Sequence, residues 1–462
     1  MQVPAHPSPA GPRGSMSPIR QEIRSLVRLA GPVMITQLGT MLLGVVDTLM
    51  LGHVGVRELA AAALGNLWIF ATLLFGMGVV LGMDPIVSQA HGAGDGHRVG
   101  LTLQHGIVIA LGVSLPLAVL WALTSPVLLL AGQEETLARQ AQIYTWVQIP
   151  GIPFFMVYTA LRQYLQGRTI VTPAMWSILI ANLFNVFFNW VLIFGHLGFP
   201  ALGLLGAGIA TTVTRVLLLI GLVAWVRGFR LHLGAWGPWT RASFHLPSLR
   251  QVLAIGLPLG CQLFLEVWAF SISTLMAGRL GEAQLAGHSI VLNLASLSFM
   301  APLGISIGAS TRVGNLIGAG QDSAVSRACW VAFAMGAGVM TLFAAVFVLG
   351  RHWLPALYTT DPTVIEICAW ILPIAALFQV FDGTQVVGGG LLRGMGRTRA
   401  AAVFNGIGYY VLALPLAWWL TFRLGTGLVG IWWGLCLGLA TIATLLVLWV
   451  WRCGAALRPL ER

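Results

Sequence analysis

The sequence contains no lysine, so all 25 of its lysine-plus-arginine residues are arginines. Without lysine there is no P-loop, whose Gly-Lys-Ser/Thr motif binds nucleotide phosphates. There is also no lysine amine to form a Schiff base with retinal or pyridoxal phosphate. Any uphill process that this chain performs would therefore have to draw its energy from an ion gradient or a separate subunit, and we expect no cofactor beyond a coupling ion.

Charged residues of either sign are scarce. They make up 8% of the 462 residues, whereas hydrophobic residues make up 57%. An ordinary soluble domain has about 25% charged residues, while a bilayer-spanning helix needs about 20 mostly apolar ones. Apolar runs of this length recur along the chain. They predict an all-α integral membrane protein with spans at 26–52, 59–84, 98–124, 137–161, 170–195, 202–226, 249–277, 286–309, 325–349, 362–390, 400–421 and 427–451.

The arginines are scattered over many short loops, which argues against nucleic acid as a partner despite the formal net charge of +11. Nineteen lie in the two terminal segments and in the loops on one side of the predicted membrane. Arg215 lies within a span, and five lie on the opposite side, namely Arg57, Arg139, Arg279, Arg351 and Arg423. Because arginine-rich segments stay in the cytoplasm, we expect both termini there, in a bacterial inner (plasma) membrane.

The sequence repeats itself at an offset of 226 residues. Thr48-Leu-Met-Leu-Gly52 matches Thr274-Leu-Met-Ala-Gly278, and Gly92-Ala-Gly94 matches Gly318-Ala-Gly320. Six helices in each copy is an even number, so the two copies share one orientation. They should be related by a pseudo-two-fold axis along the membrane normal, with binding at the repeat interface.

The repeat divides the chain into five parts. Residues 1–25 are expected to be a disordered cytoplasmic tail, 26–226 an N-terminal six-helix lobe, and 227–248 a cytoplasmic linker. Residues 249–451 form the C-terminal six-helix lobe and 452–462 a second cytoplasmic tail. The first segment has no apolar stretch after a basic start, so we expect a tail there and not a signal peptide.

Three acidic residues lie deep within predicted spans: Asp47, Glu266 and Asp382. A carboxylate at that depth costs at least about 2.5 kcal/mol and usually marks an ion or substrate pathway. The alternative is a structural, hydrogen-bonded carboxyl. For Asp84 and Glu366, which lie nearer the ends of their spans and should reach water, we favour this structural alternative.

Each deep carboxyl has polar company. Asn185 and Asn189 are four residues apart and share a helical face, so with Asp47 they could form a polar pocket that Thr211 joins. In the second half the candidates are Gln262, Asn293 and Gln379. A sodium ion at Glu266, Asp382 and Asn293 is possible, and so is a proton held by the carboxyl pair. Asparagine and threonine also simply join membrane helices, and that alternative stays open.

No enzyme is expected. The segment from Gly304 to Gly308 fits the G-x-S-x-G pattern, but this nucleophile motif needs a strand–turn–helix elbow. Here the pattern lies inside an apolar helix. His91 and His97 lack metal-ligand spacing.

Five segments together resemble the multidrug and toxic compound extrusion (MATE) family, and its NorM-type branch in particular. They are Val46-Asp-Thr-Leu-Met-Leu-Gly52, Gln89-Ala-His-Gly-Ala-Gly94, Asn185-Val-Phe-Phe-Asn-Trp190, Asn293-Leu-Ala-Ser296, and Asp382-Gly-Thr-Gln-Val-Val387 with Leu392-Arg-Gly394. The resemblance implies two six-helix lobes around a central cavity and alternating access. It also implies that Asp47, Glu266 and Asp382 are the functional acids. Sodium-coupled members often have tyrosine one turn before the last of these, and Phe378 stands there, which favours protons.

We therefore expect a secondary active multidrug efflux antiporter that exports cationic or amphipathic organic compounds in exchange for protons or sodium ions. The expected partners are the lipid bilayer and these small organic substrates, and the chain is expected to act as a monomer. The alternative is a related flippase for a lipid-linked oligosaccharide. A flippase would need arginines in its cavity to bind pyrophosphate, and Arg215 is the main arginine inside a span.

Overall fold

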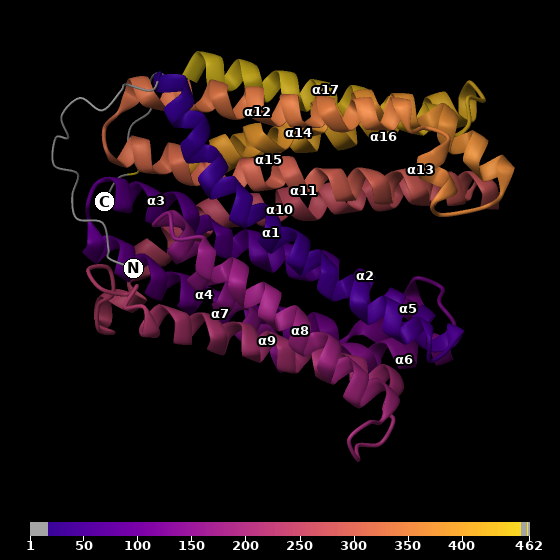
Figure 1. Cartoon of the computed structure of the whole chain (residues 1–462), viewed down its shortest axis with the longest axis horizontal. Coiled ribbons are helices and arrows are strands. Elements are labelled where there is room, and N and C mark those ends of the chain that lie inside the picture. Colours follow the sequence, from indigo (N-terminus) through magenta and orange to yellow (C-terminus); the bar gives the residue numbers. More distant parts are fainter. Residues whose placement is uncertain (1–16, 454–459, 461–462) are drawn as a thin grey trace.

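The structure is a computed structural model that describes residues 17–453 and residue 460. All regular structure in these residues is helical, which confirms the expected all-α membrane fold of two six-helix lobes (Figure 1). The N-terminal lobe contains α1 (Pro18–Gly52), α2 (Val56–Val80), the 3-10 helix η1 (Leu81–Met83), α3 (Asp84–Gly92), α4 (Gly96–Ala122), α5 (Thr124–Leu130), α6 (Glu135–Trp146), α7 (Gly151–Gly167), α8 (Thr172–Phe194) and α9 (Gly203–Gly228).

A linker with the 3-10 helix η2 (Arg241–Phe244) leads into the C-terminal lobe. This lobe contains α10 (Leu246–Gly278), α11 (Glu282–Gly318), α12 (Asp322–Leu349), α13 (Trp353–Ala356), α14 (Pro362–Gly394), α15 (Thr398–Gly406), α16 (Leu414–Trp418) and α17 (Leu428–Cys453). Two π-helical segments, η3 (Ile407–Ala413) and η4 (Trp419–Arg423), flank α16 and join it to α15 in one continuous span.

Eleven helical stretches of the described chain are long and apolar enough to cross a membrane. The one predicted span that is missing from these eleven, 137–161, is broken between α6 and α7. Pro150 lacks the backbone N–H that would continue the α6 ladder. Side chains of α9 bind carbonyls near the break: Thr212 donates to Val147 at 2.7 Å and Arg215 to Gln148 at 3.5 Å. A break at membrane depth needs such bonds, because lipid offers none.

The expected terminal tails need correction. Residues 18–25 are helical, because α1 already begins at Pro18. The side chain of Glu22 is buried and forms a bidentate ion pair with Arg312 of α11, with N···O distances of 2.8 and 2.9 Å. At the other end α17 continues to Cys453. The remaining tail predictions, for 1–16 and for 454–462 apart from residue 460, lie outside the described residues.

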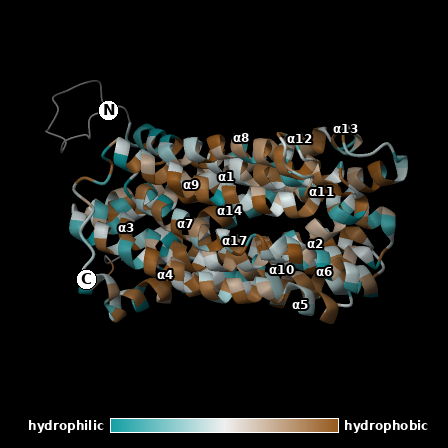
Figure 2. Ribbon diagram, turned by 90° about the horizontal axis from the view of Figure 1, so that it is seen from below, coloured by the Kyte–Doolittle hydropathy of each residue, from teal (hydrophilic) through white to brown (hydrophobic). Residues whose placement is uncertain are grey.

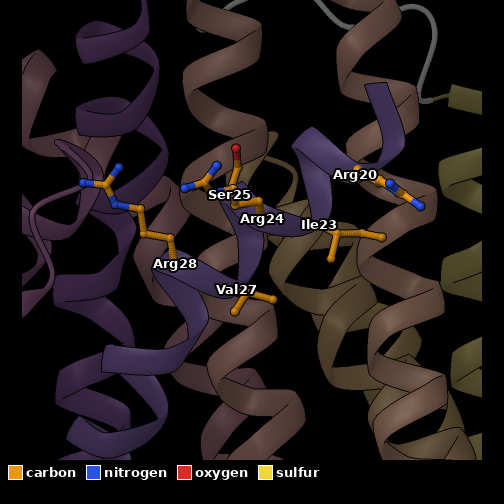
Figure 3. Close-up of a pocket in the computed structure, with 6 residues that line it drawn as sticks. All are labelled: Arg20, Ile23, Arg24, Ser25, Val27 and Arg28. Atoms are coloured by element: carbon orange, nitrogen blue, oxygen red, sulfur yellow. The ribbon is translucent and has the colours of Figure 1, made fainter. Parts of the chain in front are cut away.

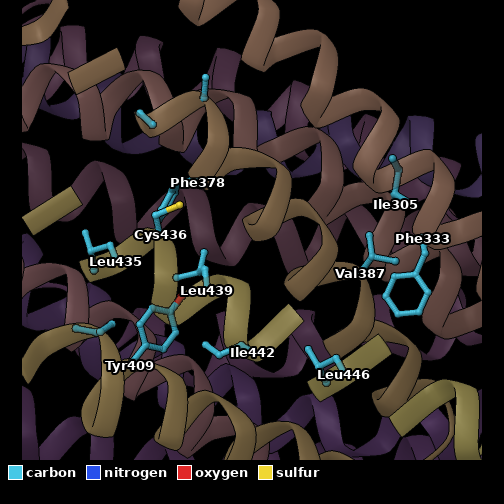
Figure 4. Close-up of a cluster of buried hydrophobic side chains, with 14 of the residues drawn as sticks. Ile305, Phe333, Phe378, Val387, Tyr409, Leu435, Cys436, Leu439, Ile442 and Leu446 are labelled. Carbon is cyan, nitrogen blue, oxygen red and sulfur yellow. The ribbon is translucent and has the colours of Figure 1, made fainter. Parts of the chain in front are cut away.

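Each lobe has its own hydrophobic core. One core lies almost wholly within residues 269–450 (Figure 4), and a second almost wholly within 51–255. Leucines such as Leu115, Leu183 and Leu342 are instead 70–73% exposed in the middle of their helices. Figure 2 shows apolar residues along the length of the bundle and hydrophilic ones gathered toward its two ends. Exposed apolar helix faces of this kind belong against lipid.

The two lobes meet along symmetry-related contacts between α2 and α10 and between α1 and α11. An added Cβ at Gly78 would lie 2.4 Å from Cα of Gly260, and one at Gly304 would lie 2.1 Å from Cγ of Met34. The 226-residue offset relates these two contacts to each other, since it maps 78 onto 304 and 34 onto 260. The repeat seen in the sequence is therefore a spatial two-fold relation.

The symmetry axis passes between α3 and the end of α11. A Cβ at Gly92 would lie 2.0 Å from the Asn315 carbonyl oxygen, and one at Gly318 would lie 1.9 Å from the Gln89 carbonyl oxygen. The offset pairs these residues with each other too. In Figure 1 α3 lies at the same end of the bundle as the start of α1 and the end of α17. The lobes therefore pack backbone to backbone at the end where the described chain starts.

Candidate functional sites in the two lobes

The N-terminal site is built around the buried carboxyl of Asp47 in α1. Its Oδ1 accepts a hydrogen bond from Asn189 Nδ2 at 2.6 Å, and its Oδ2 accepts one from Thr211 Oγ1 at 2.8 Å. Asn189 Nδ2 also donates to Asn185 Oδ1 at 3.2 Å, and Asn185 itself faces the carboxyl. The structure thus brings together the four residues Asp47, Asn185, Asn189 and Thr211, from α1, α8 and α9.

Sequence reasoning noted Arg215 inside a span but did not assign it, or Tyr144, to this site. Arg215 lies one turn after Thr211 on α9, within electrostatic reach of Asp47. Its guanidinium is buried against the rings of Trp121 and Phe155, at 5.3 and 5.7 Å. Tyr144 of the broken α6 is also near, and its hydroxyl donates to Asn66 Oδ1 at 3.1 Å. Two features of the sequence could have indicated these groups. One is the four-residue spacing of Thr211 and Arg215, and the other is the Pro150-Gly151 pair, which breaks the helix that carries Tyr144.

The C-terminal site pairs Glu266 of α10 with Asp382 of α14. Their carboxyls are close enough to repel each other when both are charged. The hydroxyl of Tyr409, in the π-helical segment η3, lies beside Glu266. That hydroxyl has no hydrogen bond of ordinary geometry to any described residue. Tyr409 was not predicted, because nothing in the sequence places η3 against α10.

The supporting residues of this lobe are more dispersed. Gln379 is buried and accepts a hydrogen bond from Ser298 Oγ at 2.7 Å. Gln262 is buried one turn before Glu266 on α10. Asn293 is exposed on α11, and its amide donates to the carbonyl of Ser289 on its own helix rather than to either carboxyl. Phe378 packs edge-on against Phe270 and Trp432 and presents no oxygen.

The expectation that Asp84 reaches water is wrong. It is fully buried in α3, where its Oδ2 accepts a hydrogen bond from Ser310 Oγ of α11 at 2.7 Å and lies 3.6 Å from Arg393 Nε of α14. Asp84 and Ser310 are 226 residues apart, so they are equivalent positions that meet at the symmetry axis. Depth along one helix did not reveal that the other lobe covers this carboxyl. Glu366, by contrast, is exposed.

The glycine contacts beside Asp84 lead to a prediction. In Gly92→Ala or Gly318→Ala, the new Cβ overlaps a backbone carbonyl oxygen of the other lobe. Overpacking of this kind costs about 1–3 kcal/mol, equivalent to roughly a 5- to 150-fold shift in a two-state equilibrium. We expect the lobes to separate at this end. Spin labels at His97 and Gln321, both exposed, should report a longer distance.

The control for this prediction is Gly44→Ala in α1, where an added Cβ meets nothing within 4 Å. It should leave the label distance unchanged. An unchanged distance in both interface variants would show that this packing does not hold the lobes together.

Among the described residues, no three His, Cys, Asp or Glu side chains gather as a metal site would require. Ser306, of the G-x-S-x-G pattern, donates to the Val386 carbonyl at 2.6 Å and lies inside α11. It thus joins two helices, with no strand–turn–helix elbow around it.

Comparisons with known proteins agree on one family. The sequence profile of the MatE family matches residues 32–191 and 258–419. The chain is 37% identical, over 95% of both chains, to a probable multidrug resistance protein NorM of Mesorhizobium japonicum. It is 34% identical to mouse multidrug and toxin extrusion protein 2, over 92% of this chain and 74% of that one.

Solved structures that resemble this fold include MATE transporters. The eukaryotic transporter AtDTX14 superimposes with a TM-score of 0.87 at 24% identity, covering 95% of this chain and 98% of that one. VcmN of Vibrio cholerae, in its bent form, gives a TM-score of 0.84 at 19% identity with the same coverage. At these identities the likeness speaks for the fold alone.

Proposed function

The chain belongs to the MatE family of multidrug extrusion transporters, and we propose that it is an antiporter which exports cationic or amphipathic organic compounds in exchange for protons or sodium ions. The observation that carries this proposal is a carboxyl site in each lobe, the buried Asp47 in one and the half-buried Glu266 with the buried Asp382 in the other. A carboxylate in a poorly hydrated site attracts a cation strongly. A proton or sodium ion bound there would neutralise the charge that attracts the substrate, so ion and substrate would compete.

Alternating access would use the contacts between the lobes. The contacts of α3 with α11 lie at one end of the bundle, and the carboxyl sites lie deeper along the helices. Opening that end would have to break the Asp84–Ser310 hydrogen bond and the Asp84–Arg393 ion pair. Breaking a buried pair is costly, so these contacts would favour two distinct states over a continuum.

Transport in inverted membrane vesicles tests this function. Uptake of a fluorescent organic cation should require an imposed proton or sodium gradient and should stop when that gradient is dissipated. Vesicles from cells without the protein provide the baseline. Uptake that persists unchanged without any ion gradient would contradict antiport.

For the orientation, we propose a bacterial inner membrane with both termini and residues 227–248 in the cytoplasm. A single cysteine near Gly132, between α5 and α6, should react with an impermeant reagent added from the periplasm, and one near Gly234 should not. The five native cysteines are first replaced by serine or alanine. Labelling near Gly234 alone would reverse the orientation. The proposed monomer is tested by sedimentation of the detergent-solubilised chain.

A further inference from the structure

The first turns of α1 carry a row of arginines. Arg20, Arg24 and Arg28 follow one another at four-residue spacing, so they share one broad face of the helix, and all three are exposed. In the part of the chain that the structure describes, none of the three guanidinium groups has an acidic partner. These arginines line one hollow together with Ile23, Ser25 and Val27. In Figure 3 the side chains of Arg24 and Arg28 extend to one side of α1 and that of Arg20 to the other.

The acidic residue of this segment is already engaged elsewhere. Glu22 lies on the buried side of α1, in its ion pair with Arg312. No carboxylate from the described part of the chain lines the hollow, which has a volume of about 580 Å³. A site with three guanidinium groups and no acidic side chain from the described residues is complementary to an anion from outside the protein.

The length of α1 places this face at the membrane surface. A helix of 35 residues is about 52 Å long at about 1.5 Å per residue, whereas the hydrocarbon core of a bilayer is about 30 Å thick. Arg28 is the last charged residue before an uncharged stretch that runs from Leu29 to Val46. The arginines therefore lie where the headgroups begin. Ile19, Ile23 and Val27, which are 56%, 39% and 53% exposed, lie where acyl chains can reach them.

We propose that this arginine face (Arg20, Arg24 and Arg28) binds the phosphate of an anionic phospholipid. A guanidinium fork forms paired hydrogen bonds with two phosphate oxygens, and Ile23 and Val27 would contact the lipid's acyl chains. The site lies on the helix that both lobes share. Leu29 and Ala30 of α1 pack on Gly308 of the C-terminal lobe, whereas Asp47 bonds to α8 and α9 of the N-terminal lobe. A lipid bound here would thus hold the first part of α1 at the membrane surface.

The test measures lipid retention by the full-length protein. Detergent-purified protein is mixed with phosphatidylglycerol or phosphatidylcholine, and retained lipid is counted by native mass spectrometry. Arg20→Gln/Arg24→Gln/Arg28→Gln removes the face. The matched control, Arg227→Gln/Arg230→Gln/Arg241→Gln, removes the same charge from exposed positions in and beside the linker.

We expect the wild type and the control to retain phosphatidylglycerol in preference to phosphatidylcholine. The α1 variant should lose roughly fivefold in affinity for each arginine removed. Arg20→Lys/Arg24→Lys/Arg28→Lys keeps the charge but removes the guanidinium groups. Its affinity for phosphatidylglycerol should lie between those of the wild type and the glutamine variant. Inorganic phosphate at the lipid's concentration should not displace it, because phosphate lacks acyl chains.

Three results would overturn the proposal. They are wild-type retention of phosphatidylglycerol by the α1 variant, an equal loss in the control, and displacement of the lipid by free phosphate. Thermal unfolding of each variant shows whether it is folded. If the glutamine variant is unfolded, the lysine variant decides alone: retention equal to the wild type overturns the proposal, and reduced retention supports it.

Discussion

Asp47→Asn is expected to abolish drug export while leaving the protein folded. The asparagine can still accept the hydrogen bond from Asn189 and can donate one to Thr211, so the local packing survives. What it loses is the negative charge that would bind a cationic substrate. Removing one partner of a buried charge pair costs about 2–5 kcal/mol. Substrate affinity should therefore fall by at least about 30-fold.

Asp95→Asn is the matched control. It makes the same chemical change at the N-cap of α4, where the side chain accepts from the backbone N–H of Arg98 at 2.9 Å. Asparagine caps a helix about as well as aspartate, so export should be unchanged. Export by inverted vesicles and thermal unfolding are measured for both variants. Wild-type export by the folded Asp47→Asn protein would show that this carboxyl is only structural.

The N-terminal site could be predicted because its members obey helical spacing. Asn185 and Asn189 share a face by their separation alone, and Asp47 stood out as a charge inside an apolar run. The lobes and their symmetry were also predictable, because the repeat preserves the glycines at which backbones touch. A position that packs against a neighbouring backbone has to be glycine, and such a glycine can be recognised in both copies of the repeat. The pairs Gly92–Gly318 and Gly78–Gly304 are examples, since each glycine closely approaches the opposite lobe.

The features that could not be predicted depend on contacts between helices, which the periodicity of a single helix does not encode. Asp84 was judged by its distance from a helix end, but Ser310 and Arg393 of the other lobe cover it. Tyr409 reaches Glu266 only because η3 lies beside α10. The break between α6 and α7 could have been anticipated from Pro150. Its partners Thr212 and Arg215 on α9 could not, because a sequence does not state which helix fills a gap.

The ion-coupling hypothesis concerns Glu266 and Asp382 as one unit. Two neighbouring carboxyls in a poorly hydrated site cannot readily both stay charged, so one binds a proton or a cation bridges them. A sodium ion needs several oxygen ligands around it. Phe378 presents none, and the Asn293 side chain is exposed and bonded to its own helix. Tyr409 adds one hydroxyl, which can equally serve a carboxyl that gains and loses a proton.

We therefore expect that a proton gradient drives export and that a sodium gradient at clamped pH does not. In the double variant Glu266→Gln/Asp382→Asn, whose side chains keep their shape, the response to the gradient should disappear. Coupling between two sites typically changes affinity by roughly 5- to 150-fold, so the loss should be easily measured. Tyr409→Phe, which removes only the hydroxyl, should weaken the response without abolishing it.

These outcomes can be separated by imposing the two gradients independently on the same vesicle preparation. Export driven by sodium at clamped pH, and indifferent to a proton gradient, would overturn the preference for protons and leave the carboxyl pair as a sodium site. Full coupled export by the folded double variant would overturn the C-terminal site itself. In that case Asp47 of the N-terminal lobe would be the candidate for the coupling carboxyl. Its environment differs, because Asp47 has Arg215 as a counter-charge. The C-terminal pair has no basic neighbour of comparable closeness among the described residues.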